Sequence, residues 1–377
     1  MDASAVGGPQ DLSFLPSPEI RKWGGGPITR YAKNVWIVSG YKEARAVLSD
    51  PVRFSSSITN PYAPQRYDFI LSDPPGHTRV RKALMPEFTT SRVAQLRPSL
   101  EARVEALFGE ISRKSPPVDL IEHLVRPAVY GMSARLLGLP ASDYARFNRW
   151  AHLFESKSAS ADAKHEAGLE LFEYISALVA HAKEHPGDNL PTRLMARNPD
   201  FTDEETASIV TSLAVAGFNP PKGLIGVGLL ALLQRPERLG ECLTEQAIPA
   251  VVQELIRYLA TVPAICRLAT TDIQLASHDV QKGDFVYVSL AAAGRDSREF
   301  HDMENFDIHR SDLRHLQFGH GIHHCLGKAL TETLFEIILT QMSRRFPTIA
   351  LHQPKASPHY LSQDSNYHSA DYIPVCW

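Results

Sequence analysis

Hydrophobic residues recur at helical spacing through most of the chain and alternate like strand residues only in short stretches. Apolar positions at every third or fourth residue indicate a helix with one buried face. This spacing predicts a short helix over 41–48 and longer helices over 91–113, 120–137, 141–155, 161–184, 203–234, 244–258 and 326–344. Capping residues support several of these, and residues 202–205 place Thr before three acidic side chains.

The stretches typical of strands are few and short. Residues 35–38 form a β-rich run closed by Ser39-Gly40, and residues 272–275 and 284–288 lie on either side of a Lys-Gly turn. The last six residues are again strand-like, whereas residues 56–76 have the composition of a loop. The pattern predicts a mainly α fold with small β-sheets. We assign β-rich regions at about 30–60, 265–290 and 350–377, and a helical body at about 77–258 and 326–344.

The composition is that of an ordinary globular protein. Of 377 residues, 44% are apolar and 21% are charged, and the net charge is 39 − 42 = −3. That balance disfavours a nucleic-acid partner, which would need a broad basic surface. The length would allow two or three domains, but no linker or internal repeat divides the chain, so we expect one domain over 1–377.

Cysteine usage and the N-terminal sequence indicate a reduced, intracellular protein. Four cysteines without a CxxC spacing make neither a disulfide framework nor a zinc ribbon, and they do not attach haem covalently. No basic region followed by an apolar region marks a signal peptide at the start. Residues 209–233 are long enough to cross a bilayer, but Asn219-Pro220-Pro221-Lys222 interrupts them, so we expect a buried helix with a break.

The segment 318–327, FGHGIHHCLG, carries the strongest chemical signal. Its glycines allow a sharp turn, and Cys325 comes just before a predicted helix, where free N–H groups favour a thiolate. A thiolate held on a rigid loop can be an axial ligand to iron. A lone Cys is more often a small buried side chain, and the adjacent histidines could suggest zinc. Three neighbouring residues, however, cannot readily surround one tetrahedral ion.

These residues resemble the haem-binding loop of the cytochrome P450 superfamily. The likeness rests on Phe318, Gly319, Gly321, His323, Cys325 and Gly327. Residues 73–81, 254–257, 295–296 and 306–307 resemble further motifs of the superfamily in the same order. The resemblance is to the soluble bacterial type. It implies the cytochrome P450 fold, a triangular helical body with haem b between the long central helix and the helix after the cysteine loop.

The resemblance also implies how the haem is held. Cys325 would be the axial ligand, and Phe318, Gly319 and Gly327 would form the loop around it. Burying two haem propionates without partners would be costly, and the positions that meet them in the family are occupied by His77, Arg81, Arg267 and His323.

Glu254 and Arg257 are three residues apart on one predicted helix. By spacing alone they are a surface ion pair of a few tenths of a kcal/mol. The resemblance instead implies a buried network that serves folding and haem retention.

The central helix departs from the family pattern. Relatives have an acid and an alcohol where this chain has Asn219 and Pro220, after Ala216 and Gly217. Proline donates no N–H, and an interior Pro costs roughly 3 kcal/mol, so we expect the helix to open here. Free carbonyls of Ala216 and Gly217 would then face the iron. Neither Asn nor Pro is a good general acid for the protons that dioxygen cleavage consumes.

Several reactions remain open from the sequence. Ordered water could replace the missing acid, or the substrate could supply its own hydroxyl or N–H. The enzyme could also abstract hydrogen without inserting oxygen, as in oxidative coupling or ring closure. A peroxide-driven peroxygenase and a non-catalytic haem-binding sensor or carrier are the alternatives to a monooxygenase.

The resemblance implies a small apolar or aromatic substrate, of secondary-metabolite type. The pocket residues it implies are Phe69, Phe154, Leu213, Phe218, Val262, Ile265 and His368. No flavin or nicotinamide motif is fused to the chain, so we expect ferredoxin and ferredoxin reductase as electron donors. A basic patch of Arg79, Lys82, Arg314 and Lys328 could dock them. We further expect a cytoplasmic monomer without a membrane anchor.

Overall fold

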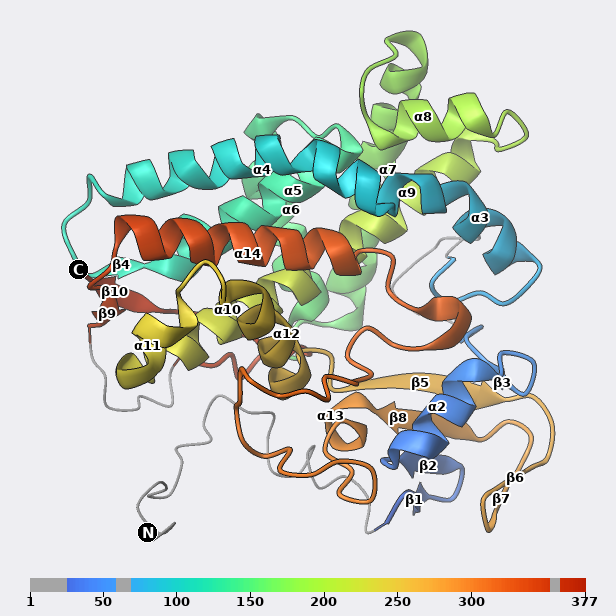
Figure 1. Ribbon diagram of the computed structural model, residues 1–377. Coiled ribbons are helices and arrows are strands. Elements are labelled where there is room, and N and C mark those ends of the chain that lie inside the picture. Colours follow the sequence, from blue (N-terminus) through green and yellow to red (C-terminus); the bar gives the residue numbers. More distant parts are fainter. Residues whose placement is uncertain (1–25, 59–68, 353–359) are drawn as a thin grey trace, which may run out of the picture.

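The computed structural model describes residues 26–58, 69–352 and 360–377, which are mostly helical with three small sheets. The predicted class, mainly α with small sheets, is confirmed. Figure 1 shows the helices on one side of the molecule and the largest sheet on the other. The single-domain assignment remains a prediction.

The largest sheet joins strands from both halves of the chain in the order β1-β2-β8-β5-β3. Its strands are β1 (Ile28–Ala32), β2 (Val35–Val38), β3 (Phe54–Ser55), β5 (Ala264–Ala269) and β8 (Phe285–Ser289). β2 runs parallel to β8, and helix α2 (Tyr41–Ser49) covers the sheet (Figure 1). Residues 35–38, 41–48 and 284–288 are therefore predicted correctly as strand, helix and strand.

Two smaller sheets complete the β structure. The predicted strand 272–275 is found as β6 (Ile273–Leu275), which pairs with β7 (His278–Val280) and not with β8. Near the C-terminus, β10 (Pro374–Cys376) lies between β4 (Val118–Asp119) and β9 (Ala350–Leu351). The strand-like tail is thus confirmed, and it joins residues almost 260 positions apart.

Most predicted helices are found within a few residues of their expected bounds. They are α4 (Thr90–Ile111), α5 (Arg126–Leu137), α6 (Tyr144–Glu155), α7 (Ala161–Glu184), α9 (Asp203–Ala216), α10 (Asn219–Leu233), α12 (Ile248–Leu259) and α14 (Lys328–Arg345). Thr202 and Glu205 form the capping box at the start of α9. A π-turn (Ile121–Val125) precedes α5, and short 3-10 turns cover Met85–Phe88, Ala141–Asp143 and Gly321–His323.

Among the described residues, four helices have no counterpart in the predicted ranges. They are α3 (Gly76–Leu84), α8 (Leu190–Arg197), α11 (Pro236–Cys242) and α13 (Leu290–Ala293). Each has nine residues or fewer, which is too short for a 3.6-residue period to stand out from its surroundings.

The predicted central helix, 203–234, is divided into α9 and α10 at Gly217-Phe218. Pro220 and Pro221 stand in the first turn of α10, where a missing N–H costs no helical hydrogen bond. Residues 203–233 are the one described stretch long and apolar enough to cross a membrane, and 72% of its most apolar window is buried inside the protein. Such burial is also typical of a core helix, so length and hydropathy alone are weak evidence for a membrane span.

Two clusters of buried apolar side chains hold the fold together. The larger one fills the helical body, where α4 and α14 lie side by side (Figure 1). The smaller one packs the large sheet against α2 and against buried residues between Leu290 and Leu316. The main cavity lies between them, because Phe69 and Met132 of the larger cluster and Leu290 of the smaller one all line it.

Candidate functional site

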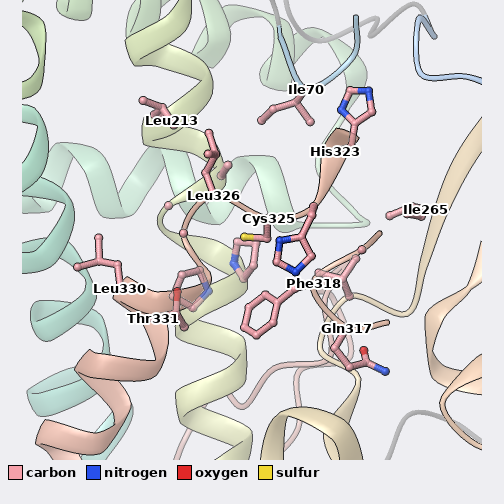
Figure 2. A pocket seen from close by; sticks show the side chains of 18 of the residues that line it. Ile70, Leu213, Ile265, Gln317, Phe318, His323, Cys325, Leu326, Leu330 and Thr331 are labelled. Atoms are coloured by element: carbon pink, nitrogen blue, oxygen red, sulfur yellow. The ribbon is translucent and has the colours of Figure 1, made fainter. Parts of the chain in front are cut away.

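A cavity of about 550 Å³ lies between the α9–α10 break and the loop that precedes α14. This volume falls in the range of small-molecule sites, roughly 300–1,000 Å³. Figure 2 shows the sulfur of Cys325 in the middle of the side chains that line it, with Leu213 and Ile70 on one side and Phe318 and Gln317 on the other.

The cysteine loop owes its shape to two left-handed glycines. Gly319 and Gly321 have φ angles of 73° and 71°, which are unfavourable for other residues. The Cys325 N–H donates to the carbonyl of Phe318 at 2.8 Å, so the loop folds back on itself and turns the thiol toward the cavity. Gly327 follows at the start of α14, where an added Cβ would lie 3.9 Å from Cys325 Sγ.

Substitution of Gly321 by Ala is expected to destabilise this loop by about 1–3 kcal/mol. The positive φ would strain an L-residue, and the new Cβ would overlap the backbone carbonyl of Leu48 in α2. Denaturant unfolding and the haem content of the purified protein measure the effect. Gly76→Ala is the matched control, since a Cβ there has no atom within 4 Å. Equal unfolding free energies for the two variants would contradict this account.

The acidity of Cys325 differs from the simple expectation of a helix-stabilised thiolate. The N–H groups of Gly327 and Lys328 do lower the pKa of the thiol, but desolvation is the larger effect and raises it overall. The helix terminus alone therefore does not favour the thiolate. A bound metal cation would displace the proton, because metal ligands bind deprotonated.

Beside the loop lies a cluster of basic side chains, formed by His77, Arg81, Arg267 and His323. His77 and Arg267 are buried, and Arg81 and His323 are half-buried. The rings of His77 and His323 are 4.1 Å apart between centroids. Among the described residues, neither ring nitrogen of His77 has a hydrogen-bond partner, and neither does Nε2 of His323. Arg267 is 8% exposed and donates one N–H to the carbonyl of Cys266.

Burial makes this cluster a poor place for positive charge on its own. Desolvation, then His77 and Arg267, lower the pKa of His323 to about 3. Desolvation likewise lowers the pKa of His77, Arg81 and Arg267. Unsatisfied donors and uncompensated cations in one buried place fit a ligand that carries carboxylates. The two propionates of haem are such groups, so the residues present fit the cofactor.

A zinc centre at His323, His324 and Cys325 is not supported. In residues 26–58, 69–352 and 360–377, no group of three or more His, Cys, Asp or Glu side chains is placed to hold a metal ion.

Where the central helix is broken, it lines the main cavity with backbone atoms and small side chains and with no acidic side chain. Ala216, Gly217 and Pro220 line it. The carbonyl of Gly217, which we expected to be free, accepts a hydrogen bond from Ser133 Oγ at 3.2 Å. Asn219 does not line the cavity, because its Nδ2 donates to the carbonyl of Ala151 in α6 at 2.8 Å.

Four of the seven predicted pocket residues line the cavity: Phe69, Leu213, Val262 and Ile265. Three do not. Phe154 packs against the helical core, Phe218 lines a second, smaller cavity, and Nδ1 of His368 lies 3.0 Å from the carbonyl of Leu259. The sequence interpretation also missed lining residues that helices distant in sequence supply, including Met132, Ser133, Leu136, Leu330 and Thr331.

Glu254 and Arg257 lie in the core of the protein, with both side chains 0% exposed. Arg257 makes a two-pronged contact with Glu254 at 2.6 and 2.7 Å and donates to the carbonyls of Met303 and Asn305. Glu254 also accepts from the N–H of Asp307 at 2.9 Å. The pair therefore anchors α12 to the segment that leads toward the cysteine loop.

Comparisons with known proteins identify the family of this chain. The family model Cytochrome P450 matches residues 151–365. Cytochrome P450 105C1 of a Streptomyces species is 34% identical over 357 residues, which cover 93% of this chain and 92% of the relative. This chain belongs to the cytochrome P450 family. As a P450 it is an oxidoreductase whose cofactor is haem b, iron protoporphyrin IX.

Solved P450 structures share the whole fold. OxyB from Actinoplanes teichomyceticus superposes with a TM-score of 0.82 at 32% identity, covering 97% of each chain. The putative thioether synthase SgvP, involved in the tailoring of griseoviridin, gives a TM-score of 0.88 at 32% identity and the same coverage. The expected cytochrome P450 fold is confirmed. Relatives of this P450 are bacterial enzymes of secondary metabolism.

Proposed function

We propose that this P450 joins two atoms of a small apolar or aromatic secondary metabolite, by ring closure or oxidative coupling, and inserts no oxygen. The observation that carries the proposal is the α9–α10 break, where Pro220 replaces the alcohol and Asn219 turns toward α6, so the substrate and not this helix supplies the O–H or N–H groups from which hydrogen is abstracted. The similarity to SgvP, named as a putative thioether synthase, supports bond formation as the outcome.

The side chains of the cavity suit this task. Bound haem supplies oxidising power at its iron, and we infer that Cys325 holds that iron while His77, Arg81, Arg267 and His323 hold the propionates. Apolar walls, with Phe69, Leu213, Val262 and Ile265 among them, exclude water and orient the substrate. The hydroxyls of Ser133 and Thr261 are polar handles on that wall.

Replacement of Asn219-Pro220 by Asp-Thr tests the proposal. Pro220→Thr should cost little stability, because Pro220 occupies a helix position that needs no N–H. Asp at position 219 is buried and lacks the Nδ2 donor to the Ala151 carbonyl, so the variant should lose about 1–3 kcal/mol. Circular dichroism and haem content therefore check its fold first. A panel of phenolic and macrocyclic compounds is first screened for shifts of the ferric Soret band. Compounds that bind are then turned over under oxygen-18 dioxygen. We expect an unlabelled product from the natural enzyme and a rise in labelled product from the variant.

Full incorporation of oxygen-18 by both proteins would refute the proposal and favour hydroxylation. Hydroxylation is the second candidate, because a relative of 31% identity is named 6-deoxyerythronolide B hydroxylase. Mass spectrometry of the same reactions separates the two, since only hydroxylation adds the mass of one labelled oxygen atom.

Bacterial P450s take electrons from ferredoxin and its reductase, and we propose these donors for a monomeric, cytoplasmic enzyme. The predicted basic patch needs revision, because most of its charge is compensated locally. Arg79 pairs with Asp200 and Glu205, Arg314 with Asp312, and Lys328 with Glu332. Docking would therefore depend on shape and on Lys82 more than on a strong positive field.

A further inference from the structure

A second cavity, of about 260 Å³, lies on the other side of the broken helix. It is lined by Arg126, Asn148, Ala151, His152, Glu155, Phe218 and Lys222. Around the break, Gly217, Pro220 and Pro221 face the main cavity, whereas Phe218 and Lys222 face the second one. One turn of helix therefore separates the two cavities.

The second cavity contains a buried ion pair. Lys222 is 2% exposed and Glu155 is 4% exposed, and Lys222 Nζ lies 2.5 Å from Glu155 Oε1. Such a pair is expensive to bury, and a Lys in the first turn of a helix also opposes the helix dipole. Desolvation lowers the pKa of Lys222 despite the opposing effect of Glu155. The attraction between the two charges alone therefore does not explain why an ion pair is buried at this position.

The P450 reaction consumes protons, and a buried source of protons beside the main cavity would serve it. Releasing one atom of dioxygen as water takes two protons and two electrons, whether or not the other atom enters the substrate. The electrons come from the external donor, but the usual acid and alcohol of the central helix are missing. Lys222 follows Pro221, which lines the main cavity, and the Lys222 ammonium beside Glu155 carries a transferable proton.

Polar groups at the break can bind waters that carry that proton. Asn219 is 2% exposed, and its Oδ1 has no hydrogen-bond partner among the described residues. Ser133 lines the main cavity and donates to the carbonyl of Gly217 at the break itself. The second cavity has room for several waters, at about 30 Å³ each, next to polar side chains that can bind them.

We propose that Glu155 and Lys222 supply protons to the main cavity across the α9–α10 break, in place of the missing acid and alcohol. A proton leaves the Lys222 ammonium toward Asn219 and Ser133, and a proton from solvent replaces it through waters that the second cavity has room to hold. No electron moves in this step. The demand for protons is the same for coupling and for hydroxylation, so the proposal does not depend on which of them occurs.

Glu155→Gln is the direct test, and it needs no natural substrate. The haem-loaded protein is supplied with NADPH, a surrogate ferredoxin and its reductase, and dioxygen. We expect NADPH oxidation that ends in water to fall roughly a hundredfold, as for loss of a general acid, and hydrogen peroxide release to rise. With hydrogen peroxide as oxidant and guaiacol as reporter, the rate should change little, because peroxide already carries both protons.

Asp364→Asn is the matched control for a purely structural role. Asp364 accepts hydrogen bonds from Ser156 Oγ and the N–H of Ser158, so it fastens the tail to the same corner of α6. If Glu155 has only a structural role, both variants should release the same amount of hydrogen peroxide per NADPH. If it supplies protons, Asp364→Asn should release no more peroxide per NADPH than the natural protein. Glu155→Asp, which keeps the acid, should recover part of the yield of water. Should Glu155→Gln fail to fold, the double variant E155L/K222M removes both charges at similar volume and must release peroxide in the same way.

A spectroscopic measurement tests the pair without turnover. The ammonium N–H bending band that is lost in E155L/K222M should shift within seconds after the resting natural protein is transferred to D2O, because solvent reaches the pair and its N–H groups exchange to N–D. A band that stays unshifted for hours, or an unchanged peroxide fraction in a folded Glu155→Gln variant, overturns the proposal. Neither result would bear on the oxygen-18 experiment.

Discussion

Replacement of Cys325 by Ser is expected to abolish the red-shifted Soret band that thiolate ligation gives the reduced carbon monoxide complex. Dioxygen-dependent turnover should fall to background with it. A serine hydroxyl is a poor substitute for a sulfur ligand that pushes electron density toward the iron. The loop itself should persist, because the bond from residue 325 to Phe318 is made by the backbone N–H. Loss of the band would then report ligand chemistry rather than unfolding.

Absorption spectra of the dithionite-reduced, carbon monoxide-treated protein measure this result, and circular dichroism checks the fold. Cys376→Ser is the matched control, since Cys376 lies on β10 and does not line the cavity. Its spectrum should equal that of the natural protein. An unchanged band in Cys325→Ser would show that another residue binds the iron.

The parts of the site that lie together in the sequence could be predicted from it. The cysteine loop is one segment of ten residues, and its glycines and thiol together indicate a tight turn that presents a metal ligand. Helix α7 was likewise predicted with its observed bounds. The wall of the cavity is different. Met132, Leu213 and Leu330 come from three helices, and a hydrophobic pattern shows only that each has a buried face. Whether that face meets the core or a ligand depends on tertiary packing.

The central helix shows the same limit within a single turn. Two prolines predicted a break, and the chain does end α9 and begin α10 there. The direction of Asn219 could not be read from the sequence. Once Pro220 and Pro221 face the main cavity, the helical rotation turns Phe218 and Lys222 to the opposite side. A position aligned with a catalytic acid can therefore carry a side chain that points elsewhere.

Charges were the least predictable feature, because desolvation does not appear in a sequence. Counting residues gave no reason to expect that Lys222 is buried against Glu155. It also gave no reason to expect that local acids compensate Arg79 and Arg314. The resemblance alone placed His77 and His323 near haem. Their unsatisfied nitrogens, visible only in three dimensions, are what suits them to an anion.

Removal of the Arg257 side chain is the second change with a large expected effect. Arg257→Ala should lower the free energy of unfolding by about 3–5 kcal/mol, because Glu254 would keep a buried charge without its main partner. The carbonyls of Met303 and Asn305 would also lose a donor. Since the same segment continues into the cysteine loop, haem content after purification should fall as well. Denaturant unfolding and the haem absorbance per polypeptide measure the two effects.

Arg314→Ala is the matched control, because the Arg314–Asp312 pair is 52% and 41% exposed and such pairs contribute at most about 1 kcal/mol. The double variant E254L/R257M separates pairing from packing. It removes both charges and keeps most of the volume, so it should regain much of the stability that Arg257→Ala loses. If it holds haem no better than Arg257→Ala, the bonds from Arg257 to Met303 and Asn305, rather than the ion pair, position the cysteine loop. Equal stability of Arg257→Ala and Arg314→Ala would instead show that the buried network contributes nothing to the fold.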